Sequence, residues 1–272
     1  MKIAFSSDNH LDINRVDVAA ILPQMAAALI AAKVDYYVNT GDTFNDFTKT
    51  RSFYAQLQAQ LGASVQVRYL AGNHDMVRGI SYAELEELDD PLYLHNRAEQ
   101  LPGTNATLVG NNGWYDYSFV PADAGVTPSE LRHWKKAFWI DGVIEQPQSD
   151  AERMQAVLTQ VRAKLAANAG RQIIFATHFV PQRAFLNPQM LQSEVGAKVA
   201  AFLGSQALGN LLTEAHVDTV GFGHLHRRDA ARTIDGVRYL HMPVGYGTKR
   251  RHEWQSTDFM TEWRATLQVM TL

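Results

Sequence analysis

Short clusters of Asp, Asn and His recur along the chain, and these residue types can bind metal ions. The clusters are Asp8-Asn9-His10, Gly41-Asp42, Gly72-Asn73-His74-Asp75, Thr177-His178 and Gly223-His224-Leu225-His226. Carboxylates, amide oxygens and neutral imidazoles are ligands for divalent ions such as Mn, Fe and Zn. Because the sequence contains no cysteine, any metal site must use nitrogen and oxygen ligands. The clusters therefore predict a metal centre without thiolates.

The number of clusters suits a centre with two ions. Two ions about 3.5–4 Å apart can clamp a phosphate, polarise it and generate a hydroxide nucleophile. Such a pair needs about seven protein ligands, one of them a bridging carboxylate, and the clusters supply that number. Glycine precedes Asp42, Asn73 and His224, which lets the backbone turn sharply and approach the ions. The predicted chemistry is metal-assisted hydrolysis of a phosphoester.

Each cluster follows a short apolar run that is typical of a strand. Strands are predicted at residues 2–6, 35–39, 65–71, 171–176 and 217–222, and helices at 16–33, 51–61 and 150–168. This alternation favours parallel pairing with crossover helices. In such a sheet, ligand sites form beyond the carboxyl ends of the strands, so the clusters should converge on one crevice.

The C-terminal part follows a different pattern. Residues 230–234 and 237–242 flank Asp235-Gly236, which predicts a β-hairpin. From Phe259 to Val269, every second residue alternates with a more polar neighbour, which predicts a half-buried terminal strand. Parallel strands followed by antiparallel ones indicate an α/β fold with two sheets packed face to face and helices outside.

Residues from about 114 to 148 fit this rhythm less well. The segment holds three of the five tryptophans, Trp114, Trp134 and Trp139. We interpret it as an insertion over the active-site end of a single domain that spans residues 1–272. Residues 114–117 could stack on a base or another flat leaving group, but packing within the insertion is the simpler interpretation. The basic run 249–251 is interpreted as a solvated loop rather than a substrate clamp.

Composition and charge narrow the possible partners. The 272-residue chain has 46% hydrophobic residues, enough for a large core, and a formal net charge of -3. This charge argues against a broadly basic nucleic-acid-binding protein. No apolar stretch approaches the roughly 18 residues of a membrane span, and the N-terminal residues lack a signal-peptide pattern. The sequence therefore predicts a soluble, cytoplasmic protein without a membrane partner.

In order and spacing, the clusters resemble the signature of the calcineurin-like metallophosphoesterase superfamily. The resemblance spans the chain from the first strand to His226. It implies a four-layer α-β-β-α sandwich with two mixed sheets and a dinuclear metal centre at the carboxyl ends of the strands. It also implies two divalent or mixed-valence ions, and the N/O ligands leave their identity open among Mn, Fe and Zn.

Transferred onto the matching positions, the resemblance implies a role for each motif residue. The ligands would form two sets around a shared bridge: Asp8, His10 and His226 on one ion, Asn73, His178 and His224 on the other, and Asp42 between them. A hydroxide bridging the ions would attack phosphorus. His74 would donate a proton to the leaving alkoxide or steady a phosphoryl oxygen, and Asp75 would orient the His74 ring.

The segment after Gly41-Asp42 departs from the pattern of some family members, which carry an arginine there to grip phosphate. Here Thr43-Phe44-Asn45-Asp46-Phe47 follows, and the first arginine is Arg51. The difference argues against a close analogy to the protein Ser/Thr phosphatases. Asn45 either fills part of the arginine's space or caps a turn.

Three functions are compatible with these residues. The complete ligand set together with His74 favours a hydrolase of phosphomonoesters or phosphodiesters that acts on a small phosphoester, with nucleotides among the candidates. A non-catalytic interaction module on the same fold would be expected to lose ligands or the catalytic histidine. A nucleic-acid-processing nuclease usually adds a coiled coil and a DNA-capping domain, and the mildly acidic sequence gives that alternative little support.

Overall fold

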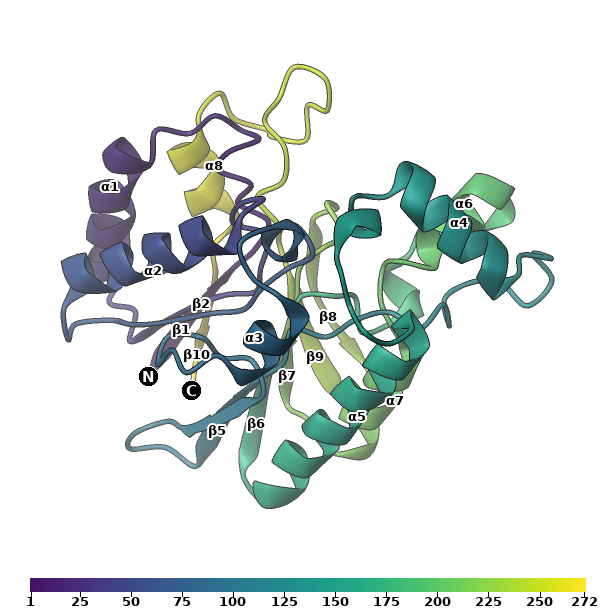
Figure 1. Ribbon diagram of the computed structural model, residues 1–272. Helices are drawn as coiled ribbons and strands as arrows, with labels where there is room; N and C mark the ends of the chain where they lie inside the picture. The colour runs from purple at the N-terminus through teal and green to yellow at the C-terminus, as the bar shows by residue number, and fades with distance from the viewer.

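The computed structural model describes residues 1–272, and its strands form two mixed sheets (Figure 1). The first sheet has the strand order β10-β1-β2-β3, in which only β10 runs antiparallel to its neighbour. Its strands are β1 (Lys2–Ser6), β2 (Tyr36–Asn39), β3 (Gln66–Tyr69) and β10 (Gln268–Thr271).

The second sheet has the strand order β4-β5-β6-β7-β9-β8. The four central strands are parallel, and β4 and β8 pair antiparallel at the two edges. Its strands are β4 (Arg97–Gln100), β5 (Ala106–Gly110), β6 (Gln172–Ala176), β7 (Thr219–Gly221), β8 (Asp229–Ile234) and β9 (Val237–His241). Both sheets are therefore mixed, as predicted.

The sheets pack face to face through side chains that alternate along their strands. Ile3 and Phe5 of β1 belong to the same buried apolar cluster as Leu108 of β5 and Ile174 of β6. Ala4, which lies between Ile3 and Phe5, belongs instead to the larger core that contains the helices. This period of two buries both faces of the central strands.

Helices cover the outer faces of the two sheets and complete the four α-β-β-α layers. The helices α1 (Val18–Ala31), α2 (Phe47–Leu61) and α8 (Phe259–Thr266) lie over the first sheet, and α5 (Asp150–Ala167) and α7 (Gln206–Glu214) over the second (Figure 1). The other helices are α3 (Tyr82–Glu87), α4 (Pro128–Phe138) and α6 (Glu194–Ala200), with the 3-10 turns η1 (Asp75–Val77), η2 (Ile140–Val143), η3 (Arg183–Phe185) and η4 (Met190–Gln192). The predicted fold class is confirmed. None of the helices has the length and apolar character needed to cross a membrane.

The predicted hairpin is present as β8 and β9. Asp235 and Gly236 form its turn with φ angles of 50° and 83°. Positive φ at both central residues is the requirement of a type I′ turn, which explains why Asp-Gly predicts the hairpin. The strand β9 also pairs in parallel with β7, so the hairpin extends the second sheet.

The strand expected from Phe259 to Val269 is wrong for most of its length, because this segment forms α8 and only then β10. Residues four apart, such as Phe259 and Trp263, share one face in a strand and also in a helix. Asp258 favours the helix, since its side chain accepts a hydrogen bond from the Thr261 backbone N at 2.9 Å and caps the first turn. Met260 is also buried, which fits helical spacing and not alternation.

The cap of α8 gives a test of this corrected element. Replacing Asp258 with Ala should lower the free energy of unfolding by about 1 kcal/mol, because the first-turn N–H groups lose their acceptor. Asp258→Asn keeps an acceptor oxygen and should retain most of the stability. Chemical denaturation of the two variants measures the difference, and equal stability of Asp258→Ala and the parent would contradict the cap.

Candidate metal centre

The ligand candidates lie in the loops that follow five strands, β1, β2, β3, β6 and β7. Asp8 and His10 come after β1, and Asp42 after β2. Their donor atoms form two groups with Asp42 in common: Asp8, His10, Asp42 and His226, and Asp42, His178 and His224. Within each group the donor atoms lie within 4.8 Å of one another. The convergence expected from the strand ends is thus what the structure shows.

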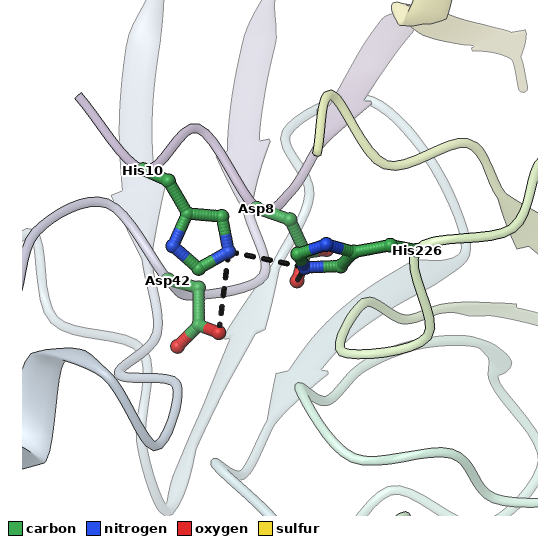
Figure 2. Close-up of side chains that lie close together, drawn as sticks. All are labelled: Asp8, His10, Asp42 and His226. Atoms are coloured by element: carbon green, nitrogen blue, oxygen red, sulfur yellow. Dashed lines mark hydrogen bonds and ion pairs between the residues drawn. The ribbon is translucent and has the colours of Figure 1, made fainter. Parts of the chain in front are cut away.

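In the first group, the four side chains lie close together around a common position (Figure 2). The Nε2 atoms of His10 and His226 are 3.1 Å apart. His226 Nε2 lies 3.2 Å from Asp8 Oδ1, and His10 Nε2 lies 3.7 Å from Asp42 Oδ2. Asp8, His10 and Asp42 are almost completely buried. This compact set of two carboxylates and two imidazoles has the composition of a divalent metal site.

The second group has the same character and includes Asn73. His178 Nε2 lies 3.1 Å from His224 Nδ1 and 3.5 Å from Asp42 Oδ2. The amide oxygen of Asn73 is 3.2 Å from the same His178 nitrogen. The side-chain amide of Asn73 thus lies beside the second group, which consists of Asp42, His178 and His224.

Hydrogen bonds on the far side of each ring leave the facing nitrogens available to a metal ion when the rings are neutral. His178 Nδ1 lies 2.8 Å from the carbonyl oxygen of Thr40, and His224 Nε2 lies 3.1 Å from that of Phe202. A carbonyl can only accept, so these nitrogens hold the protons of the neutral rings. In the neutral rings, the two nitrogens that face each other at 3.1 Å are both acceptors. A cation between them would convert their repulsion into ligation, so the residues fit a metal ion.

Asp42 is oriented so that one of its oxygens serves both groups. Its Oδ1 accepts a hydrogen bond from the His74 backbone N at 2.9 Å. Its Oδ2 is the atom that faces both His10 and His178. A carboxylate oxygen shared in this way is the geometry expected of a bridge between two ions.

Asp75 does not orient the His74 ring, which corrects that part of the prediction. Its carboxylate instead accepts hydrogen bonds from the backbone N–H groups of Asp42 and Gly72, at 2.7 and 2.9 Å, and joins the loops after β2 and β3. Thr43, Phe44 and Thr50 donate to it as well. Burial, reinforced by the charge of Asp42, raises the pKa of Asp75 to about 7 while these donors oppose the shift.

Asn45 is the residue that contacts the His74 ring. Its Oδ1 lies 2.7 Å from His74 Nδ1, and the Tyr246 hydroxyl lies 3.3 Å from His74 Nε2. Asn45 therefore fills space beside the site rather than capping a turn, and Asp46 caps α2. The sequence raised this possibility for Asn45, whereas Tyr246 had no motif that linked it to His74.

Close backbone packing at Gly41 and Gly72 explains why glycine precedes Asp42 and Asn73. A Cβ on Gly72 would lie 2.0 Å from Asp42 Oδ1, and Gly41 has φ +106°. Several candidate ligands also have positive φ: 55° at Asp8, 60° at Asp42 and 70° at His224. Such conformations cost about 1–3 kcal/mol each in a non-glycine residue, so the surrounding contacts must enforce them.

The electrostatics of the cluster favour charged carboxylates. Burial alone would raise the pKa of Asp8 and Asp42, but the neighbouring histidines outweigh it and hold both values well below the usual range. Burial opposes charge on His178 and His226 too, yet Asp42 raises the pKa of His178 to about 9, and Asp8 with Glu253 raises that of His226 to about 10. A metal ion would compete with those protons for the ring nitrogens.

Asp141, from η2, connects the segment of residues 114–148 to the cluster. Its Oδ1 accepts a hydrogen bond from Asn73 Nδ2 at 2.7 Å, which turns the amide oxygen of Asn73 toward His178. Asp141 is fully buried, and burial raises its pKa to about 6 although the charge of Lys135 opposes the shift. No motif marks this residue, so the sequence did not indicate it.

A cavity of about 570 Å³ opens over the cluster. Phe138, Trp139 and Ile140 of the 114–148 segment line it, whereas Trp114 and Tyr115 are completely buried and form packing contacts. The packing interpretation of residues 114–117 therefore agrees with the structure. Arg250 and Arg251 also line the cavity, so two residues of the basic run face the site and not only bulk solvent.

Comparison with known proteins gives a family match. The model of a family described as calcineurin-like phosphoesterase matches residues 1–228. The chain matches none of the curated proteins.

Solved structures with a similar fold cover most of the chain. The phosphopantetheinyl hydrolase from Mycobacterium tuberculosis is 17% identical with a TM-score of 0.69, over 99% of this chain and 95% of that one. A dimetal phosphatase from Danio rerio is 15% identical with a TM-score of 0.52, over 89% and 87%. GAP50, the anchor in the inner membrane complex of Plasmodium, is 11% identical with a TM-score of 0.50, over 93% and 76%. At these identities the likeness shows the fold.

The shared oxygen of Asp42 predicts that one substitution affects both ions. In Asp42→Asn, either the amide nitrogen faces the ions or the His74 N–H loses its acceptor. The parent is expected to bind about two ions per chain, and the metal content of the variant should fall well below that number. Elemental analysis after dialysis measures the change, with circular dichroism to confirm folding. Full occupancy of both sites in the variant would contradict the bridge.

The contact between Asp141 and Asn73 predicts a selective effect on one ion. Asp141→Ala should weaken the ion on the Asn73 side by about 10-fold or more, as removal of supporting hydrogen bonds does elsewhere. Asp141→Asn retains an acceptor oxygen and should rescue most of the affinity. Metal titrations of both variants provide the test, and equal losses at both sites, or no loss in Asp141→Ala, would exclude a positioning role.

Proposed function

We propose, since this chain belongs to the calcineurin-like phosphoesterase family, that it is a hydrolase of phosphomonoesters or phosphodiesters that works with two bound metal ions. The observation that carries the proposal is the pair of ligand groups that share Asp42 at the base of a cavity. Two of the similar structures are a hydrolase and a dimetal phosphatase, which agrees with this class of reaction.

The proposed ligand sets follow the two clusters. Asp8, His10 and His226 hold one ion; Asn73, His178 and His224 hold the other, and Asp42 bridges them. When bound, two such ions polarise a phosphoryl group and lower the pKa of water enough to supply a nucleophile at neutral pH. Mn, Fe and Zn all suit these nitrogen and oxygen donors, so the ligands alone do not select the metal.

His74 is proposed to act on the substrate and not on a metal ion. It belongs to neither ligand group, yet it lines the cavity and its ring centre lies 4.6 Å from that of His10. Asn45 accepts from Nδ1, which leaves Nε2 directed toward the hydroxyl of Tyr246. When both ring nitrogens are protonated, Nε2 can donate a proton to the leaving alkoxide or hydrogen-bond a phosphoryl oxygen.

The alternative functions lead to different expectations. GAP50 is an anchor, so the fold also occurs in a protein described by its attachment role. A module of that kind has no need for converging histidine nitrogens, and this chain has one such pair on each side of Asp42. A nuclease would need a surface for a nucleic-acid backbone, and the formal net charge of -3 gives no general support for one.

The role of His74 can be separated from metal binding. His74→Ala should keep both ions and lose about 100-fold or more in kcat on an activated ester, because a positioned proton donor contributes that much. His133→Ala, an exposed histidine on α4, is the matched control and should behave like the parent. A screen of p-nitrophenyl mono- and diesters with added Mn²⁺ provides the assay.

Two outcomes would count against this assignment. Loss of metal in His74→Ala would reassign His74 as a ligand. A fully loaded parent protein that hydrolyses none of the monoesters or diesters would favour the non-catalytic module over the hydrolase.

A further inference from the structure

We infer that the substrate is a nucleotide-like phosphodiester that carries a second phosphate away from the bond to be cleaved, and that Arg250 and Arg251 bind that second phosphate. The inference rests on the function proposed above and specifies its substrate class. Two features of the cavity wall support it: two arginines without an ion-pair partner, and an exposed aromatic surface.

The two arginines have no acidic partner within the protein. Neither Arg250 nor Arg251 makes an ion pair or a side-chain hydrogen bond, and both are exposed at the cavity. Arg228, by contrast, is paired with Glu262. Guanidinium groups that are left free beside a cavity are suited to bidentate binding of a phosphate from a ligand.

Arg251 is connected to the metal ligands through one aromatic ring. Its guanidinium carbon lies 5.1 Å from the centre of the Tyr246 ring. That ring centre is 4.5 Å from the ring of His10 and 4.6 Å from that of His226. A phosphate at Arg251 would therefore lie beside the ligand cluster, at a separation that one nucleotide-sized molecule can span.

The charge balance of the cavity supports a substrate with more than one anionic group. Asp8 and Asp42 face the candidate ions, and Glu253 is already engaged by His226 and by the Tyr246 backbone N. Two bound divalent ions would carry more positive charge than these three carboxylates carry negative charge, and the arginines add further positive charge. A substrate with one charge would leave that excess unmatched.

A nucleotide also carries a flat base, and Phe138 and Trp139 offer a surface for it. Phe138 is 73% exposed although it is a large apolar residue, and it lines the same cavity as the arginines. Trp139 and Ile140 continue this apolar wall. A base can stack on such a surface, and stacking on aromatic side chains contributes to nucleotide binding without sequence preference. The cavity volume of about 570 Å³ is also in the range of small-ligand sites.

A matched pair of chromogenic diesters tests the second phosphate. Thymidine 5′-(p-nitrophenyl phosphate) and its 3′-phosphorylated derivative have the same scissile bond and leaving group. With Mn²⁺ bound, the 3′-phosphorylated compound should show about a 10-fold higher kcat/KM, because charge-assisted contacts to the arginines form only with it. In the Arg250→Gln/Arg251→Gln double variant this ratio should fall toward one.

The control variant is Lys249→Gln, which removes a neighbouring charge that does not line the cavity and should retain the ratio. A ratio near one in the parent, or its persistence in the double variant, would overturn the inference. A parallel loss on both diesters would also overturn it, because the arginines would then bind the phosphoryl group that is cleaved.

A binding measurement tests the second-phosphate site independently of hydrolysis. If neither diester is hydrolysed, the proposed function fails, and calorimetric titration of the metal-loaded protein with thymidine 3′,5′-bisphosphate and thymidine 5′-phosphate still decides the inference. Tighter binding of the bisphosphate that depends on the two arginines supports it, and equal binding of both nucleotides refutes it.

The apolar wall has its own readout in the same assay. Phe138→Ser should raise KM for the thymidine diester by roughly fivefold relative to methyl p-nitrophenyl phosphate, which has no base to stack. Because Phe138 is so exposed, the substitution removes little buried area and should leave the fold intact. An equal change in KM for both diesters would contradict base stacking at this wall.

Discussion

The rest of the site depends on the way in which the two carboxylate oxygens of Asp42 make different contacts. One oxygen is fixed by the His74 backbone N–H, so the other can face His10 and His178 at once. The carboxylate is buried, and a buried anion requires compensation by cations or hydrogen-bond donors. The histidines around it can supply that compensation as protonated rings, and metal ions that displace those protons would supply it instead.

The framework that holds Asp42 is assembled from loops at strand ends, and Asp75 ties these loops together. Asp75 ties the backbone after β2 to the backbone after β3 with several N–H groups, and glycine at position 72 allows the close approach. These contacts enforce the positive φ of Asp42. Asp141 adds a connection from the 114–148 segment, so the wall of the cavity and one candidate ligand, Asn73, are physically coupled.

How far the sequence could predict the structure depends on whether the signal was local. The ligand clusters follow strands directly, so their convergence could be expected from the topology, and Asp-Gly alone specified the hairpin. The segment of α8 was misjudged because Phe259 and Trp263 are four residues apart, a spacing that both periods allow. Asp141 and the two arginines face the site through contacts between distant segments, and no local pattern encodes such contacts.

The most direct measurement of the central claim is electron paramagnetic resonance of the protein titrated with Mn²⁺. If the oxygen of Asp42 is shared, two ions should bind per chain about 3.5–4 Å apart and give the spectrum of an exchange-coupled pair. A titration that ends at one ion, or two ions whose spectra are independent, would contradict a bridged centre.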